Sequence, residues 1–479
     1  MLKNPLRGRA FRALRALLLC ACLCVSAALP AAPAEAQSGE IWLRVGLYYG
    51  GSARSESNIY CADGFVYGIG GRSGWTERID LSGHTSLTAV PKGNHVEIYS
   101  GDELVISSMD SSGVLMSAAG DGGVIRIDGD RYRDGVSYIS NGSGKLTVVN
   151  YVELERYLWS VVGAEIGPTY PMEALKAQAV AARSFAIANE HRHSSQGFNL
   201  CDNTDCQAYK GLNREYSTTI EACRETEGEV ITYGGRVVNA YYYASSSGET
   251  MNSEDVWVSS LGYARGVSDA FATGYEWESS MSVSELYSRM KSRYPGYGEI
   301  ISVEVTDTAD NGAVRQIMID TTTGPLYVSK GSITSLFGAS TLKSLFFSMG
   351  PGGYPGFSAD ESEYSGEGPA LLSSDGLSPV PETIYVLGSG GEPEELYSED
   401  ASVLSQDGTT AGLPAGTASS GGYVYETVYD DDDVIYFSGR GSGHGVGMPQ
   451  TSMRAMAQQG YSYEDILNYY YTDIDIDTL

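Results

Sequence analysis

Basic residues are scarce in this chain of 479 residues: 31 Lys and Arg stand against 60 Asp and Glu, a formal net charge of −29. Proteins bind the phosphate backbone of nucleic acids mainly through Lys and Arg, so this deficit argues against a nucleic-acid partner and against anionic membranes. Cysteine is also rare, with 7 in the chain. The 42% hydrophobic share is too high for a wholly disordered chain, and the length predicts two to four domains.

The first 36 residues have the pattern of an export signal. Five basic residues and no acidic residue precede a short apolar run at 16–25, and Ala34-Glu35-Ala36 follows this run. A basic start, a short apolar core and a small-residue cleavage site are typical of a secretory signal peptide. We therefore expect cleavage near Ala36 and an extracytoplasmic protein, secreted or associated with the cell wall. The alternative is an uncleaved N-terminal anchor.

The mature chain divides into regions of different periodicity. Short alternating runs with Gly, Ser and Asp between them, such as 41–49 and 123–128, predict antiparallel strands, and helical periodicity begins at about residue 151. We predict an α+β protein with a β-rich N-terminal region and a mixed α/β domain that is interrupted by a flexible, acidic insertion. The predicted limits are 1–36 for the signal peptide, 37–130 for the β-rich region, 131–349 and 423–479 for the two parts of the mixed domain, and 350–422 for the Gly/Ser/Pro-rich insertion.

Two helices are predicted around Glu165. The apolar spacing over 153–165 indicates an amphipathic helix that Gly167-Pro168 ends, and a second helix should start at Pro171 and run through Arg183. Glu165 falls on the apolar face, near the C-terminal end of the first helix. Burial and the negative end of the helix dipole both raise the pKa of a carboxyl group, as a general acid near neutral pH requires. The alternative is a structural Glu that reaches solvent or pairs with Arg183.

Several segments in one order resemble the SpoIID/LytB family, the sporulation stage II D proteins and their secreted relatives. The similar segments cover roughly 130–347 and 423–470 of this chain. The most specific of them are Tyr151–Leu158, Val161–Ile166, Glu173–Ser184, Cys206–Tyr209, Ala244–Thr250, Gly439–Met448 and Gln459–Leu467.

The resemblance implies an activity. Catalytic members of the family are lytic transglycosylases, which cleave the β-1,4 bond between N-acetylmuramic acid and N-acetylglucosamine in peptidoglycan and form a 1,6-anhydro product. Their essential acid matches Glu165, so we expect Glu165 to act as general acid and then as base on glycan strands. The alternatives are a non-catalytic cell-wall protein that stimulates an N-acetylmuramoyl-L-alanine amidase, as some relatives are described, and a surface adhesin or scaffold.

Other residue types in the similar segments are candidates for substrate contacts, each with a structural alternative. Gln207 and Tyr209 either line a substrate groove or pack in a loop, and His444 either orients substrate or is satisfied by backbone carbonyls. Ser246 and Ser247 either bind sugar hydroxyls or form a turn after a strand. The predicted substrate-binding set is Gln178, Arg183, Gln207, Tyr209, Ser246, Ser247 and His444.

Cysteine and histidine cluster between residues 191 and 206. Cys201 and Cys206 follow His191 and His193 closely, and two cysteines with two histidines suit a tetrahedral zinc ion. Some family members carry zinc near the matching cysteines, with a histidine where this chain has Asp205. In an exported protein, a disulfide between Cys201 and Cys206, or with Cys61 or Cys223, is the alternative. We predict that the protein has no cofactor, and the alternative is a bound zinc ion at these residues.

Overall fold

The computed structural model describes residues 40–351 and 433–479 and, between them, only the backbone of six short strands. The predicted signal peptide, and most of the predicted insertion at 350–422, lie outside the described residues. The six strands pair two by two: β22 (Ala370–Ser373) with β23 (Gly376–Pro379), β24 (Thr383–Leu387) with β25 (Pro393–Tyr397), and β26 (Ser402–Leu404) with β27 (Thr410–Gly412).

The N-terminal part is a β-sandwich, as its alternating sequence predicts. Seven strands form one sheet in the order β13-β1-β12-β11-β8-β3-β4, and six form the other in the order β10-β9-β2-β5-β6-β7. The sheets pack face to face, since Leu43 and Val45 of the first share a core with Ile98 and Ile127 of the second. The strands are β1 (Trp42–Tyr48), β2 (Ser57–Tyr60), β3 (Phe65–Gly71), β4 (Gly74–Leu81), β5 (Ser86–Lys92), β6 (His95–Ser100), β7 (Glu103–Met109), β8 (Gly113–Ser117), β9 (Val124–Ile127), β10 (Asp130–Arg133), β11 (Gly135–Ser140), β12 (Leu146–Glu153) and β13 (Leu200–Cys201).

The sandwich continues through β12, which ends at Glu153, so the predicted limit at 130/131 falls within β10. Helix α2 (Leu154–Glu165) follows directly, with the Glu153 carboxylate capping its first turn. Helix α3 (Met172–Ala188) lies at the centre of a helical layer and contacts α2, α4 (Ser217–Glu225), α8 (Gln450–Gln458) and α9 (Tyr463–Tyr470). Its buried alanines allow this close packing on several sides.

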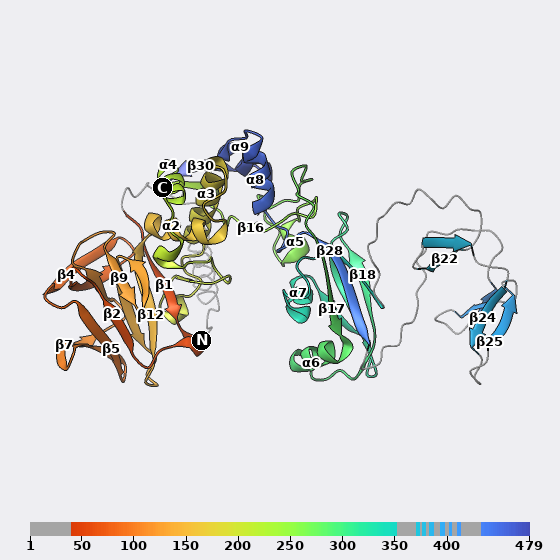
Figure 1. The fold of residues 1–479 in the computed structure, drawn as a ribbon, viewed down its shortest axis with the longest axis horizontal. Coiled ribbons are helices and arrows are strands. Elements are labelled where there is room, and N and C mark those ends of the chain that lie inside the picture. Colours follow the sequence, from red (N-terminus) through yellow and green to blue (C-terminus); the bar gives the residue numbers. More distant parts are fainter. Residues whose placement is uncertain are drawn as a thin grey trace, which may run out of the picture.

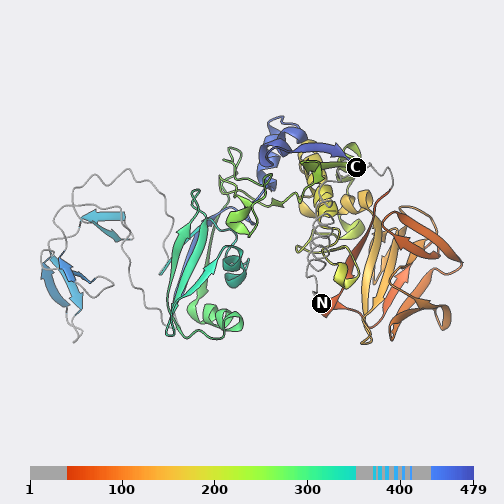
Figure 2. The same ribbon diagram turned by 180° about the vertical axis from the view of Figure 1, so that it is seen from behind.

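A second body carries residues from about 253 to 351 together with β28 (Val434–Arg440). It contains the sheets β17-β28-β21 and β18-β19-β20 and three helices. Figure 1 shows this body beside the helical layer, and Figure 2 shows the same arrangement from behind. Its other elements are α5 (Ser253–Val256), β17 (Glu276–Ser282), α6 (Val283–Arg293), β18 (Ile300–Thr308), β19 (Val314–Thr321), β20 (Leu326–Ser329), α7 (Gly331–Phe337) and β21 (Phe347–Pro351).

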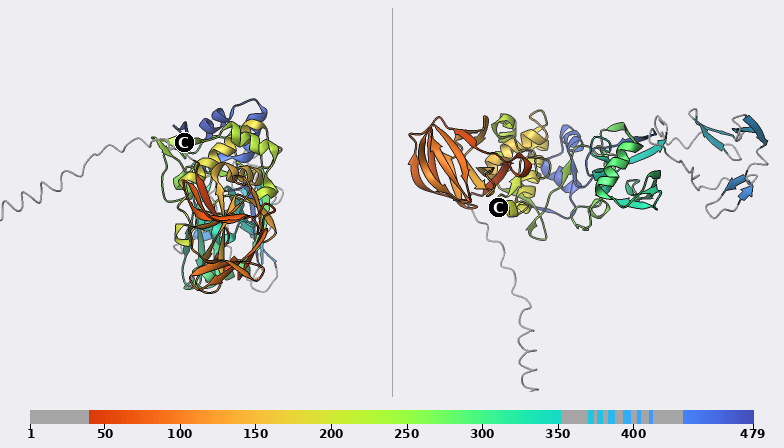
Figure 3. Two further views of the ribbon diagram at one scale, coloured as in Figure 1. Left: turned by 90° about the vertical axis from the view of Figure 1, so that its left-hand side faces the viewer. Right: turned by 90° about the horizontal axis from the view of Figure 1, so that it is seen from below.

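The C-terminal residues return to the helical layer. After β28 the chain forms β29 (Met448–Pro449), α8, α9 and β30 (Asp475–Thr478). β30 pairs with β14 (Glu229–Tyr233), whose other neighbour is β15 (Arg236–Val237), and β29 pairs with β16 (Tyr242–Tyr243). Seen from below, the sandwich, the helical layer and the second body lie in a row (Figure 3).

The predicted α+β class is confirmed. Residues 237–243 do not form one continuous strand: β15 ends at Val237, β16 starts at Tyr242, and the residues between them belong to neither. β-Branched and aromatic residues predict a strand there, but pairing partners are present only at the two ends of the segment. Three short 3₁₀ turns complete the list: η1 (Gly50–Ser52), η2 (Ser194–Gln196) and η3 (Gly211–Arg214). None of the helices in the described ranges is long and apolar enough to span a bilayer.

Candidate active site

Glu165 is the last residue of α2, as the apolar spacing predicts. Gly167, at a φ of +71°, and Pro168 end the helix. The side chain is half-buried, and its Oε1 accepts a hydrogen bond of 2.9 Å from the backbone N–H of Ala208. The Tyr242 hydroxyl and the Gln450 side-chain amide also face the carboxyl group and favour its ionised form. Three donors from distant parts of the chain therefore meet at one carboxyl group.

The surroundings of Glu165 favour its protonated form. Burial raises the pKa of this carboxyl group above its ordinary value, and the hydrogen bonds from Ala208, Gln450 and Tyr242 offset only part of that effect. The position at the C-terminal end of α2 adds the unfavourable end of the helix dipole. A carboxyl group that keeps its proton closer to neutral pH suits general acid chemistry.

Arg183 is paired with Glu155, not with Glu165. Its side chain is fully buried, and its guanidinium group holds Glu155 through two hydrogen bonds of 2.7 and 2.6 Å. It also donates to the backbone carbonyls of Glu229 and Cys223. The structure therefore uses Arg183 in the ion pair that joins α2 to α3, and its contact with substrate stays a prediction. The alternative pairing of Glu165 with Arg183 is wrong because of this ion pair.

Gln207 and Tyr209 are buried, with exposed fractions of 1% and 2%. The Gln207 Nε2 donates to the Ala182 carbonyl and to the Tyr242 hydroxyl, and its Oε1 accepts from Tyr157. The Tyr209 hydroxyl donates to Asn150 Oδ1 at 2.6 Å. Neither side chain lines a groove as predicted, because both are used to hold the 207–210 loop against α2 and β12.

Gln178 and Gln450 face each other between α3 and α8. The Gln450 Nε2 lies 3.5 Å from Gln178 Oε1, and both side chains are buried. Within the described part of the chain, Gln178 Nε2 has no hydrogen-bond partner. Because Gln450 also reaches Glu165, the pair connects the centre of α3 to the carboxyl group. The role of Gln178 in binding substrate stays a prediction.

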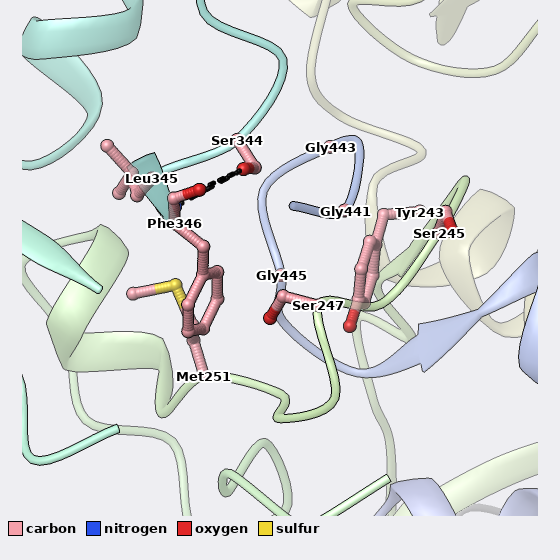
Figure 4. A pocket seen from close by; sticks show the side chains of 10 residues that line it. All are labelled: Tyr243, Ser245, Ser247, Met251, Ser344, Leu345, Phe346, Gly441, Gly443 and Gly445. Carbon is pink, nitrogen blue, oxygen red and sulfur yellow. Dashed lines mark hydrogen bonds between the residues drawn. The ribbon is translucent and has the colours of Figure 1, made fainter. Parts of the chain in front are cut away.

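The serine turn (Ser245–Gly248) and the glycine loop (Gly441–Gly445) line a small recess (Figure 4). Figure 4 shows Tyr243 on one side of the Gly441–Gly445 loop and Phe346 with Met251 on the other. Ser247 lines this recess, whereas Ser246 is fully buried and accepts a hydrogen bond from Gly248 in a turn. The cavity of about 10 Å³ has room for about one water molecule, not for a sugar ring.

The Gly439–Gly447 loop packs against the serine segment rather than against the 153–190 helices. At Gly447, with a φ of +77°, a Cβ atom would lie 2.2 Å from the Tyr241 carbonyl oxygen. His444, in the same loop, hydrogen-bonds the Tyr242 carbonyl through Nε2 and accepts the Val446 N–H at Nδ1. Burial lowers the pKa of His444 to about 4, so its ring is neutral. His444 therefore fixes the backbone of Tyr242, in agreement with the structural alternative.

A second cluster lies beside the loop that binds Glu165. The potential ligand atoms of His193, Cys201, Asp205 and Cys206 all lie within 4.8 Å of one another. His191 is outside this group: its side chain is 83% exposed and lies next to Glu190. The predicted ligand set is thus corrected in one member, with Asp205 in place of His191. The physical reason is that α3 ends at Ala188, and the turns that follow direct His193 inward and His191 outward.

The residues of this cluster fit a zinc ion. Zinc binds thiolate sulfur at about 2.3 Å and imidazole nitrogen at about 2.0 Å, so tetrahedral ligand atoms lie about 3.5 Å apart. The Cys206 sulfur lies 3.3 Å from His193 Nε2, and hydrogen bonds lower the pKa of Cys201, which favours the thiolate. All four described cysteines are free thiols. Cys61 contacts Ser117 and Cys223 lies beside Arg183, so neither is placed to bridge Cys201.

Residues 142–233 match the family model described as SpoIID, Stage II sporulation protein. This part of the chain is similar to SpoIID proteins. The match contains Glu165 and the Cys201–Cys206 loop, and it confirms the resemblance that the sequence motifs indicate. Tyr242, His444 and Gln450 lie beyond the matched residues.

Three relatives extend the similarity beyond the SpoIID domain. An uncharacterized protein of Brachyspira hyodysenteriae is 25% identical over 69% of this chain and 68% of its own length. The amidase enhancer of Bacillus subtilis is 28% identical over 66% of this chain, and the stage II sporulation protein D of the same organism is 32% identical over 25% of it. The chain spans 39% of the length of each of these two Bacillus proteins.

Tyr242, Gln450 and Asp205 are the functional candidates that the sequence did not single out. Tyr242 stands within the Tyr241-Tyr242-Tyr243 run, which is equally typical of strand packing. Gln450 follows the glycine loop by a few residues and has no spacing signal of its own. Asp205 was visible only as a departure from the histidine of zinc-carrying relatives. Each of these residues is identified by the residues that lie next to it in the folded structure, not by its local sequence pattern.

Proposed function

We propose that this protein is an exported peptidoglycan lytic transglycosylase with Glu165 as its general acid and base. One observation carries the proposal: a half-buried carboxyl group at the end of α2, with a raised pKa, is held by three donors. The SpoIID domain and the named relatives support a role at the cell wall. Glycan strands of peptidoglycan are the proposed substrate, and zinc is not required for the chemical step.

The chemistry needs one carboxyl group that works twice. Glu165 first gives its proton to the oxygen that bridges N-acetylmuramic acid and N-acetylglucosamine, and the bond from that oxygen to the anomeric carbon breaks. The ionised Glu165 then takes the proton of the muramyl 6-hydroxyl group, and the oxygen of that hydroxyl group forms the new bond to the anomeric carbon. The carboxyl group ends protonated again, and no water is consumed. This differs from hydrolysis, which generally uses two carboxylates.

Stimulation of a cell-wall amidase is the second candidate. Its specific support is the similarity to the amidase enhancer of Bacillus subtilis, which covers 66% of this chain. In that case, the protein would bind peptidoglycan or the amidase and would release no anhydro product itself. The two candidates differ in what the purified protein does alone, so they can be separated directly.

Export is part of the proposal. Residues 1–36 supply the signal, and cleavage near Ala36 would place the mature chain outside the cytoplasmic membrane. The strongly acidic composition is compatible with that location and disfavours nucleic acid as a partner. N-terminal sequencing of protein recovered from the culture medium and from the wall fraction tests this step.

Mass spectrometry of muropeptides tests the activity. The mature protein is incubated with purified glycan strands, with and without stem peptides, and we expect 1,6-anhydro-muramyl ends. Glu165→Gln should abolish them, whereas Glu221→Gln, an exposed acid on α4, should not. Anhydro products at the wild-type rate from folded Glu165→Gln would refute the assignment. Absence of products from the wild type, together with faster turnover by an added amidase, would favour the second candidate.

A further inference from the structure

Three donors around Glu165 come from segments that are far apart in sequence. Ala208 lies in the loop after the Cys201–Cys206 cluster, Tyr242 lies on β16, and Gln450 is the first residue of α8. The parallel pairing of β16 with β29 sets Tyr242 opposite Met448, two residues before Gln450. This short ladder brings both side chains to the same carboxyl group.

The direction of the Tyr242 hydroxyl proton is fixed by its other neighbour. Gln207 Nε2 is only a donor, and it lies 2.9 Å from the Tyr242 hydroxyl oxygen, which must therefore accept. The amide of Gln207 is itself oriented, because its Oε1 accepts from Tyr157 at 3.1 Å and its Nε2 also donates to Ala182. The phenolic hydrogen of Tyr242 is then left to point at Glu165.

Gln450 is constrained in a similar way. Its Nε2 carries two hydrogens, one directed to Gln178 Oε1 at 3.5 Å and the other available to Glu165. The Gln450 side chain is buried, with an exposed fraction of 8%, and Pro449 precedes it at the start of α8. It therefore reaches Glu165 from a helix end that packs against α3.

We propose that Tyr242 and Gln450 are positioning residues that leave Glu165 one direction in which to carry its acid proton. A carboxylate offers about four lone-pair directions; Ala208 donates to one, and Tyr242 and Gln450 are the donors that face two more. The proton of the acid then takes the remaining direction. This inference rests on the proposed transglycosylase function, because a proton aimed away from the protein matters only if a substrate oxygen receives it.

Few groups around Glu165 compete for this role. The titratable side chains that face it are the phenols of Tyr242 and Tyr157, and burial raises the pKa of both well above the ordinary value. His444 is neutral and holds the Tyr242 backbone rather than the carboxyl group. Changes at Tyr242 or Gln450 should therefore act through lost hydrogen bonds, not through an altered charge.

The test measures Glu165 directly. The mature protein is labelled with ¹³C at glutamate carboxyl groups, and the Glu165 resonance is assigned by its loss in Glu165→Gln. In Tyr242→Phe and in Gln450→Ala, one donor to the ionised form is gone, so the midpoint of the Glu165 titration should rise by about 0.5 unit or more. Tyr243→Phe, on the same strand, and Gln458→Ala, exposed on the same helix, are matched controls and should leave it unchanged.

Glycan cleavage gives the second readout. In both variants the upper pH limit of cleavage should move to higher pH with the titration midpoint, and kcat should fall about tenfold while KM stays within twofold. An unchanged Glu165 titration in both Tyr242→Phe and Gln450→Ala overturns the inference, as does a shift of equal size in the controls. If the wild type releases no anhydro ends, the proposed function fails, and the role of Tyr242 and Gln450 in catalysis fails with it. The Glu165 titration does not depend on glycan cleavage, so it still tests whether these two residues position the carboxyl group.

Discussion

Asp205 stands where two kinds of partner compete for its carboxylate. Its Oδ1 lies 2.7 Å from Arg192, whereas its Oδ2 lies 3.3 Å from His193 Nε2. Arg192 is at the surface, where an ion pair contributes little to stability. Release of Asp205 toward a metal ion among His193 and the two thiols would therefore cost little.

We predict that zinc binding depends on Asp205 and not on His191. Purified under reducing conditions and supplied with zinc, the wild type should retain about one ion per chain in elemental analysis. Asp205→Ala should weaken binding at least about tenfold in competition with a chromogenic chelator, because a four-coordinate site loses a ligand. His191→Ala is the matched control and should bind as the wild type does.

Two results would contradict this prediction. Equal zinc retention by Asp205→Ala and the wild type would remove the carboxylate from the site, and weakened binding by His191→Ala would restore the ligand set that the sequence suggested. Purification without reductant is informative as well. A disulfide between Cys201 and Cys206 would consume both thiols, and mass spectrometry of alkylated peptides would detect it.

The sequence alone predicts where the proposed acid, Glu165, lies, but not the roles of its neighbours. Helical periodicity is enough to place Glu165 on the inner face, since this depends only on residues within α2. Arg183, Gln207 and Tyr209 belong to the same similar segments, yet burial and internal partners make them structural. Whether a polar side chain faces a groove or a buried partner depends on distant elements, which one sequence does not reveal.

At the scale of elements, the cap of α2 is unusual. Glu153 accepts hydrogen bonds from the backbone N–H groups of Glu155 and Arg156, yet burial raises the pKa of Glu153 to about 7. The unfolded chain releases this proton near pH 4.5. Between these values the folded protein binds a proton that the unfolded chain has lost. The contribution of Glu153 to stability is therefore fully present below pH 4.5 and is lost as the pH rises to about 7.

We predict that Glu153→Gln reduces this pH dependence. The free energy of urea unfolding of the wild type should fall between pH 5 and pH 8 by about 2–3 kcal/mol more than that of Glu153→Gln, since each pKa unit corresponds to about 1.4 kcal/mol. The comparison of the two pH differences cancels any loss of capping strength that is independent of pH. Parallel pH dependences in the two proteins would show that Glu153 does not titrate in this range.

Elements defined by local pattern were the most predictable part of the fold. Ser282 caps the first turn of α6, Gly460 at positive φ separates α8 from α9, and Ser462 and Asp465 form a capping box at the start of α9. These depend on spacing and on cap residues a few positions apart. β29 was not predictable, because it has two residues and exists only through its pairing with β16.

At the scale of the whole molecule, the proposed site is assembled from both ends of the chain. Glu165 and Ala208 lie in the SpoIID match, and Gln450 follows only after the second body has been traversed. The chain enters the second body after Ser245 and leaves it before Ser442. These two residues pair with each other in an isolated antiparallel β-bridge. The second body also contacts the helical layer, because Asp269 accepts hydrogen bonds from Ser452 of α8 and Tyr470 of α9. The residues that complete the site therefore return along a face that the second body also contacts.

The segment between β21 and β28 begins and ends at adjacent places. Pro351 pairs with Ile435 across the two antiparallel strands, so a tight turn can connect them. We predict that replacing residues 353–432 by a four-residue Gly/Asn turn leaves the protein folded, with a thermal midpoint equal to or above that of the wild type. A shorter loop costs less closure entropy on folding, which is the physical reason for expecting no loss.

Thermal unfolding and glycan cleavage of this deletion variant together assign a role to the segment. If the proposed site is complete without it, the ¹³C titration of Glu165 and the release of anhydro ends should match the wild type. A drop in the thermal midpoint of more than about 5 °C would mean that the segment contributes packing to the second body. An unchanged midpoint with lost cleavage of intact cell walls, but normal cleavage of purified strands, would assign it to contacts with a partner or with the wall.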